Sequence, residues 1–402
     1  MAGGLAAIVF APLGLAAGVP QNVDMRADGR VVVTNTGVEP SGTDDDLRLV
    51  EEMRLGGIFG DGPDIFGDIS DIAVADDGRI FVLDTGAQEV RVFGDDGRYL
   101  RGMARDGEGP GELHYLPGSE NGGMRVVLHE PNRLWIGSAL QHLVLDSLGN
   151  EVARAPLRVP WYVEGEFITR ERVVGSDERF VYQDVSVGAK RTEDDLDYPR
   201  YNYAVRLPRP VDGETVYGPG DSLRIETRRI NVSPPAIRSV PGRGQAMVSM
   251  SEASPRQFAW TVGGGNVWLA HRSAYRFHEV TFAGDTIRTV ELGDPPPSPP
   301  LTEVLDAAEL NPRIAALHVS PEGWLWVARE GEEDEGSSWD LFDNCGRYRG
   351  AVGAPDRLWA LSLGARGEVY GVVSDAFDVD YVLRLRLEGA DGTRVTMETC
   401  TF

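Results

Sequence analysis

The sequence predicts an all-β protein built from repeated four-stranded units. In residues 69–103, apolar residues alternate with polar ones over three or four short strands. Asp77 with Gly78, and Asp96 with Gly97, separate these strands, and Gly supplies the positive φ that tight antiparallel turns need. A unit of this kind that recurs along 402 residues indicates a β-propeller, in which each unit buries its faces only against its neighbours.

The turn glycines show that the unit recurs. Gly78 and Gly97 are 19 residues apart, and so are Gly265 and Gly284. We therefore predict six units, which begin near Ile69, Met124, Arg172, Gln257, Arg313 and Leu358. Large aromatic residues occupy the same second-strand position in four of them, and this recurrence predicts that they pack between units: Trp135, Trp268, Trp326 and Tyr370.

The N-terminal region contains strand-like segments that do not make a complete unit. We expect residues 47–55 to form the outer strand of the last unit, because closing the ring in this way removes exposed sheet edges. The fold predicted is therefore a six-bladed β-propeller closed by an N-terminal strand. The alternative counts residues 30–37 and 47–57 as a blade of their own, which gives a seven-bladed ring.

Four segments set the expected domain organisation. Residues 1–20 contain a short apolar run followed by small residues, which is typical of a signal peptide or its remnant and predicts export to the periplasm or the extracellular space. Residues 21–402 form a single propeller domain, with one irregular, decorated blade around residues 156–255. Residues 294–312 read as a Pro-rich connector followed by a short helix. No other segment is apolar enough to span a membrane.

Composition limits the partners. The formal net charge of −24 argues against nucleic acid and anionic lipid, since both require clustered Lys and Arg. We expect a monomer with a solvated surface. The two cysteines, Cys345 and Cys400, are too far apart for a metal-binding pair, and in an exported protein they either form one disulfide or remain two buried thiols.

Residues 73–113 resemble the NHL-type repeat of bacterial exported six-bladed β-propellers. The matching features are a turn Gly, a strand that ends at Asp84, a polar loop, the sequence VRVF, and the Gly-rich linker DGEGPGEL. The resemblance implies the fold rather than a reaction, because propellers carry many unrelated activities.

Motifs for chemistry are sparse. The six histidines are scattered and do not have the spacing of a zinc site. Acidic runs at residues 44–46 and 332–335, and the loop with Asp375, Asp378 and Asp380, could bind calcium, but charge runs between glycines are usually solvated. We therefore expect no cofactor, with calcium as the alternative. No nucleophile elbow or phosphate-binding loop stands in a fitting context.

Aromatic residues and arginines in loops are the remaining binding candidates, and they could hold a sugar, peptide or anionic ligand: Arg105, Trp161, Tyr162, Arg272 and Tyr275. The leading hypothesis is a non-catalytic scaffold that binds a protein, peptide or carbohydrate through one face. A metal-dependent lactonase-type or lyase-type enzyme with its site at the central channel is the first alternative. A structural module of a cell-surface assembly is the second.

Overall fold

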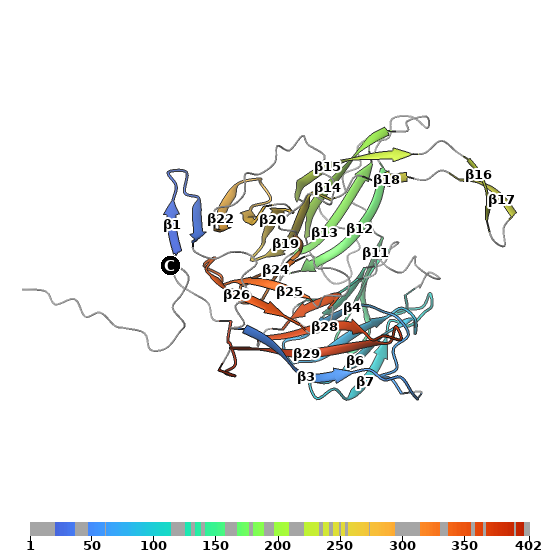
Figure 1. Cartoon of the computed structure of the whole chain (residues 1–402). Coiled ribbons are helices and arrows are strands. Elements are labelled where there is room, and N and C mark those ends of the chain that lie inside the picture. The colour runs from blue at the N-terminus through green and yellow to red at the C-terminus, as the bar shows by residue number, and fades with distance from the viewer. Residues whose placement is uncertain are drawn as a thin grey trace, which may run out of the picture.

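The structure is a computed structural model that consists of β-strands and loops (Figure 1). It describes residues 21–36, 47–60, 62–113, 125–129, 133–137, 141–156, 167–176, 180–188, 197–208, 221–232, 236–240, 244–248, 251–253, 256–272, 274–293, 314–329, 337–354, 358–364, 367–389 and 391–397. Residues 1–20 and 294–312, expected to be a signal-peptide remnant and a connector with a short helix, lie outside these ranges. Within them, no helix is long and apolar enough to cross a membrane.

Six groups of strands follow one another along the chain, and we number them as blades 1 to 6. Blade 1 contains β4 (Ile69–Val74), β5 (Ile80–Asp84), β6 (Glu89–Phe93) and β7 (Tyr99–Met103). Blade 2 contains β8 (Arg125–His129), β9 (Arg133–Gly137), β10 (Gln141–Leu145) and β11 (Glu151–Pro156). Blade 3 contains β12 (Phe167–Ser176), β13 (Phe180–Gly188), β14 (Asp197–Pro208), β15 (Asp221–Val232) and β18 (Ser251–Ala253).

Blade 4 contains β19 (Phe258–Gly263), β20 (Asn266–His271), β21 (Arg276–Val280) and β22 (Thr286–Leu292). Blade 5 contains β23 (Ile314–Val319), β24 (Leu325–Arg329), β25 (Ser338–Phe342) and β26 (Tyr348–Gly353). Blade 6 contains β27 (Ala360–Leu363), β28 (Glu368–Ser374) and β29 (Asp380–Gly389), with β3 (Leu47–Leu55) as its outer strand. The hairpin of β16 (Ala236–Val240) and β17 (Gly244–Val248) stands away from blade 3 (Figure 1).

Apolar clusters join each blade to the next around a closed ring. Separate clusters join blades 1 and 2, 2 and 3, 3 and 4, 4 and 5, and 5 and 6. A further cluster joins blade 6 to blade 1 and includes Leu55, Tyr370 and Val382 together with Ile72 and Phe93. The core therefore lies at the seams between blades, as expected for a propeller. The four recurrent aromatics, Trp135, Trp268, Trp326 and Tyr370, are all at most 4% exposed, which confirms that they pack between units.

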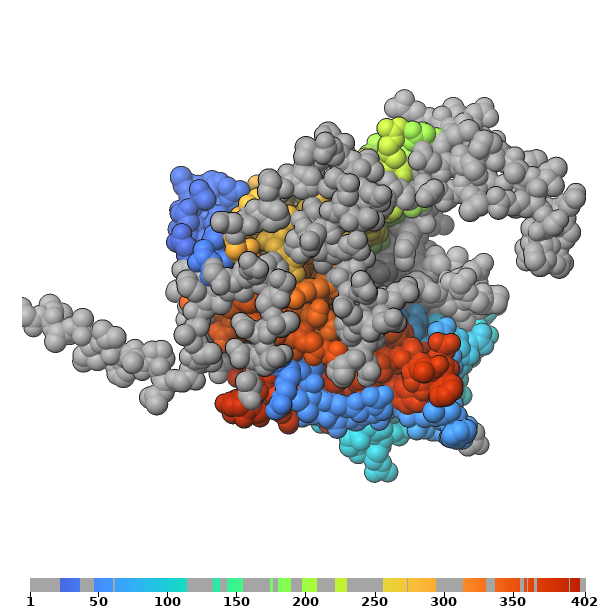
Figure 2. Space-filling view, in the orientation of Figure 1, coloured from blue at the N-terminus to red at the C-terminus, as the bar shows by residue number. Residues whose placement is uncertain are grey.

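The N-terminal strand closes the ring as predicted. β3 pairs antiparallel with β29 from Leu47 to Leu55, and two of its residues also pair with β26 of blade 5. In Figure 2 the blue N-terminal segment lies directly against the red C-terminal strands. The other N-terminal strands, β1 (Gln21–Met25) and β2 (Val31–Asn35), form a hairpin whose β2 adds in parallel to β22 of blade 4. β2 and β3 thus belong to different sheets, so residues 30–37 and 47–57 do not form a blade of their own.

Tight glycine turns occupy one end of the ring. Gly78, Gly97, Gly149, Gly284, Gly323, Gly346 and Gly367 each have φ between 77° and 93° and donate their N–H to the residue three positions earlier. This is the three-residue hairpin loop that requires a left-handed residue. These turns join first to second or third to fourth strands, and we call their end of the ring the turn face. The opposite end, the connector face, carries the loops between second and third strands and the segments between blades.

We predict that deleting residues 1–56 destabilises the fold severely, because it removes a strand that buries Leu49 and Leu55 and leaves the outer edge of β29 unpaired. The expected fall in melting temperature exceeds about 10 °C, since each buried Leu contributes about 2–5 kcal/mol. Thermal melts followed by circular dichroism measure it, with a deletion of residues 1–20 as the control. Equal melting temperatures for the two truncations would contradict the role of β3.

Candidate functional site

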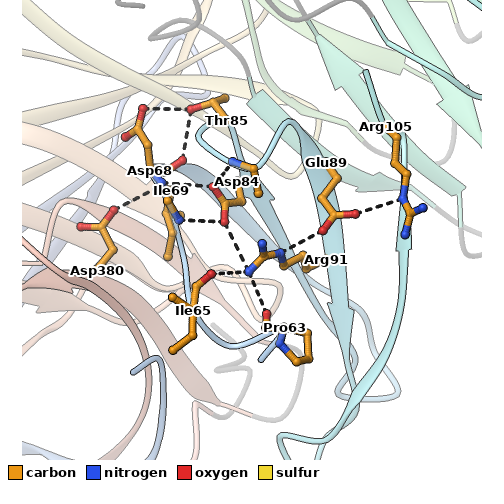
Figure 3. A network of polar contacts seen from close by, with 12 residues as sticks. Pro63, Ile65, Asp68, Ile69, Asp84, Thr85, Glu89, Arg91, Arg105 and Asp380 are labelled. Atoms are coloured by element: carbon orange, nitrogen blue, oxygen red, sulfur yellow. Dashed lines mark hydrogen bonds and ion pairs between the residues drawn. The ribbon is translucent and has the colours of Figure 1, made fainter. Parts of the chain in front are cut away.

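A network of polar contacts at the junction of blades 6 and 1 includes the loop after β5 (Figure 3). Asp84, which ends β5 and is fully buried, accepts hydrogen bonds from the backbone N–H groups of Gly67 (3.0 Å), Asp68 (3.1 Å) and Ala87 (2.9 Å). Arg91 lies 3.6 Å from the Asp84 carboxylate and donates to the carbonyl of Pro63 at 2.9 Å. Every oxygen of this carboxylate is therefore engaged by the protein.

Two glycines let the loop and the connector approach each other. A Cβ on Gly86 would lie 2.6 Å from the carbonyl carbon of Gly67, which is too close for any side chain. Thr85 also donates to Asp68, and Asp380 of blade 6 accepts from the N–H of Ile69 at 3.0 Å. The residues that carry the family resemblance therefore hold the segment between blades 6 and 1 in place. We assign a structural role to this network.

A second buried carboxylate, Asp340 on β25, joins blades 4 and 5. It accepts hydrogen bonds from the hydroxyls of Tyr275 (2.6 Å) and Tyr348 (2.9 Å) and from Nε of Arg329 (2.8 Å). Burial and, to a smaller extent, the nearby Asp340 carboxylate raise the pKa of Tyr275 above its ordinary range. Both oxygens of Asp340 are engaged, so this network is also structural.

Of the three sequence-predicted binding residues that the structure describes, Arg272 and Tyr275 share the loop between β20 and β21, whereas Arg105 follows β7 of blade 1. Tyr275 is 1% exposed and belongs to the core between blades 4 and 5. Arg272 donates to the carbonyl of Ile314 at 2.6 Å and so fixes the start of β23. Arg105 is exposed beside blade 1, where it donates to Glu89 at 3.2 Å. Trp161 and Tyr162 lie outside the described residues, as do the acidic runs at residues 44–46 and 332–335.

The metal and cysteine expectations remain predictions. Among the described residues, no group of three or more His, Cys, Asp and Glu side chains could hold a metal ion. Asp375 and Asp380 instead accept hydrogen bonds from neighbouring groups of the β28–β29 turn. Cys345 is 1% exposed and is not a free thiol, while Cys400 lies outside the described residues.

The candidate site is a polar cluster at the seam between blades 3 and 4, inside the irregular segment. Ser186 of β13 pairs with Asn202 of β14, which in turn pairs with Glu226 of β15, so the three side chains form a row on one face of the sheet. Asp184 lies two residues before Ser186 and therefore on the same face. All four residues are at most 8% exposed, and we call them, together with Arg200, Arg228 and Arg256, the seam cluster.

Two acceptor oxygens of the seam cluster receive no hydrogen bond from the described residues. Arg256, which precedes β19, donates to Oδ2 of Asp184 at 2.8 Å, and Asn202 donates its Nδ2 to the Ser186 hydroxyl. Glu226 accepts from the N–H of Gln257 at 2.9 Å. Oδ1 of Asp184 and Oδ1 of Asn202 are buried without a hydrogen-bond partner in the described part of the chain. A buried acceptor left unpaired costs free energy of about 1–3 kcal/mol, so a donor placed beside either oxygen would stabilise the protein.

Among the described residues, the cluster holds three arginines and two carboxylates. Arg200 of β14 stands directly opposite Arg228 of β15, a like-charge pair that destabilises a sheet unless something offsets it. Burial lowers the pKa of Arg228, and the neighbouring guanidinium groups of Arg256 and Arg200 lower it further. Burial also raises the pKa of Glu226, so one of the two carboxylates that balance three arginines loses its charge more readily. In a chain of net charge −24, three arginines gathered beside two carboxylates favour an anionic group.

The sequence analysis did not single out these residues. A signal was present, because β13 carries Asp184 and Ser186 within a mostly apolar strand that is buried from Val181 to Gly188. The segment was recognised only as the place where the repeat is irregular.

Comparisons with known proteins agree with the fold. The sequence pattern of a family described as "6-bladed beta-propeller" matches residues 64–118, which confirms the resemblance seen in the sequence. A search of curated protein sequences finds no match. Similar solved structures include a member of the DUF4221 family from Bacteroides vulgatus, at 9% identity and a TM-score of 0.47, covering 86% of this chain and 99% of the other.

Two further solved structures are also similar to this chain at low sequence identity. A putative exported protein from Bacteroides fragilis has 11% identity and a TM-score of 0.43, covering 89% of this chain and 99% of the other. A streptogramin B lyase has 14% identity and a TM-score of 0.38, covering 86% of this chain and 100% of the other.

We predict that Asp84→Ala destabilises the protein by about 3–5 kcal/mol, because it removes the buried carboxylate that pairs with Arg91 and accepts from three backbone N–H groups. Asp96→Ala is the matched control, since Asp96 is an exposed turn residue of the same blade that accepts from one N–H group, and its expected cost is below about 1 kcal/mol. Urea unfolding followed by tryptophan fluorescence gives both values. A similar loss for the two variants would show that Asp84 does not hold the segment between blades 6 and 1 in place.

Proposed function

We propose that this protein is an exported, monomeric, non-catalytic binding protein that holds a small anionic, hydroxylated ligand at the seam between blades 3 and 4. One observation supports it above the others: two buried acceptor oxygens, of Asp184 and Asn202, lack partners beside three arginines. Guanidinium groups bind carboxylate or phosphate through paired hydrogen bonds. Hydroxyl groups on the same ligand supply the donors that Asp184 and Asn202 require.

An acidic sugar fits this combination. Its carboxylate would be bound by Arg228 and its neighbours, and its hydroxyls would donate to Oδ1 of Asp184 and of Asn202. A neutral sugar lacks the anionic group, and a simple dicarboxylate lacks the hydroxyl donors. Selectivity for the acidic sugar over both is therefore the signature of the site, because buried polar groups left unpaired penalise the wrong ligand.

A catalytic alternative has one observation in its favour, the raised pKa of Glu226, since general acids are often carboxyls whose pKa burial has raised. Incubating the purified protein with acidic oligosaccharides and analysing the products separates binding from turnover. Metal analysis before and after EDTA treatment tests the metal-dependent version, which requires a stoichiometric ion that EDTA removes.

The proposal predicts that galacturonate or glucuronate raises the melting temperature, whereas galactose, glucose and succinate do not. A ligand at about 100-fold its Kd stabilises by about 2.7 kcal/mol. Arg228→Gln should weaken binding about tenfold or more, because a hydrogen bond to a charged group contributes about 1.5–3 kcal/mol. Arg229→Gln is the control: Arg229 is the next residue, 73% exposed and paired with Asp197, so its variant should bind as the parent does.

The pH dependence adds a second readout. Because the pKa of Glu226 is raised, this carboxyl keeps its proton to a higher pH than an ordinary glutamate, and ionising it adds negative charge beside the ligand. Binding should therefore weaken as pH rises through the Glu226 pKa, and Glu226→Gln should remove that dependence. Equal shifts for acidic and neutral sugars, or equal Kd values for Arg228→Gln and Arg229→Gln, would refute the proposal.

A further inference from the structure

Large apolar side chains are exposed at the connector-face end of blade 6. Phe59 is 91% exposed, Phe377 79%, Ile58 48% and Trp359 45%. We call these four residues the blade 6 patch. Isolated exposed apolar residues need no explanation, but several at one site mark an interaction surface.

The four residues lie at the same end of a single sheet. Trp359 directly precedes β27, Phe377 lies in the turn between β28 and β29, and Ile58 and Phe59 follow β3. The strand order is β27-β28-β29-β3, so the patch extends over three strand spacings, or about 14 Å. The chain after β3 packs on the β29 end, because a Cβ on Gly56 would lie 2.7 Å from Cδ1 of Tyr381.

Phe377 is presented by a turn that the protein holds firmly. Oδ1 of Asp375 accepts from the N–H groups of Phe377 (2.8 Å) and Val379 (3.1 Å), and its Oδ2 accepts from the Tyr381 hydroxyl (3.2 Å). Asp378 has φ of 57°, a left-handed conformation uncommon outside glycine. These bonds lower the pKa of Asp375, which keeps the carboxylate ionised. Because the backbone of this turn is already ordered, binding a partner there costs less conformational entropy.

Negative charge surrounds the patch. Asp64, Asp375, Asp378 and Asp380 belong to the same two loops. Among the described residues at this end, Arg54 pairs with Glu51 at 2.8 Å and Arg91 pairs with Glu89 at 3.1 Å, so each arginine already faces another carboxylate. An apolar surface with an acidic rim complements a segment that carries both apolar and basic side chains.

We propose that the blade 6 patch is a docking surface for a basic, amphipathic segment of a partner protein. A second copy of this chain is disfavoured because both copies carry a net charge of −24, and an anionic bilayer is disfavoured for the same reason. The surface is separate from the seam cluster, which lies between blades 3 and 4, so this inference does not rest on the proposed function.

Selection of binding peptides from a random display library on the immobilised full-length chain tests the proposal. The selection is run in parallel against the parent, the double variant Phe59→Ser/Phe377→Ser, and Leu148→Ser. Leu148 is 70% exposed on the turn face, so its variant is a matched removal of apolar surface elsewhere. Thermal melts of the three proteins establish that each is folded.

The expected peptides combine Lys or Arg with aromatic or aliphatic residues and bind the parent and Leu148→Ser equally. Fluorescence anisotropy should show at least about a tenfold weaker Kd on the double variant, as for the loss of central aromatic contacts. Raising the salt concentration should weaken binding further, because the acidic rim contributes by screened charge. Acidic or purely apolar peptides, or a Kd unaffected by the double variant, would overturn the proposal. So would a concentration-dependent dimer of the parent that the double variant abolishes, since the occupant would then be a second copy.

Discussion

The closure of the ring between blades 6 and 1 is the constraint on which the other seams depend. Each blade buries its apolar faces only against its two neighbours, so an open seam would expose two faces at once. The closing seam is composite, because β3 comes from the start of the chain while β27, β28 and β29 come from its end. Leu55 of β3 and Val382 of β29 share one cluster with Ile72 and Phe93 of blade 1. The two ends of the sequence are thereby held together.

Local rules made most of this architecture predictable. A turn glycine such as Gly78 or Gly346 is required by a backbone conformation that its own four residues define, so one sequence suffices to locate it. β3 was predictable as the outer strand because a ring needs every edge paired. The parallel addition of β2 to β22 was not, since it depends on Asn35 donating to the carbonyls of Glu291 and Gly346, contacts far away in the sequence.

The candidate site could not be predicted in the same way. Asp184 and Asn202 read as ordinary polar positions of strands, and only the pairing of β13, β14 and β15 places them in one row with Glu226. Arg256 joins them from a connector 72 residues beyond Asp184. The loop after Asp84 shows the opposite case, because the Asp84 side chain is used entirely in holding the neighbouring connector. Local sequence reports which residues are polar, whereas the fold decides which of their bonds remain unmet.

Three buried carboxylates make this distinction concrete. Asp84, Asp340 and Asp184 are each at most 4% exposed, lie on second or third strands and face an arginine. For Asp84 and Asp340, backbone N–H groups, tyrosine hydroxyls and the arginine engage both oxygens, so these residues join parts of the ring and need nothing else. For Asp184, Arg256 engages one oxygen and the described protein leaves the other unpaired. The carboxylates of Asp84 and Asp340 have their hydrogen bonds complete within the protein, whereas that of Asp184 does not. A ligand would therefore contribute most at Asp184, and this difference is the physical reason for proposing a binding site between blades 3 and 4.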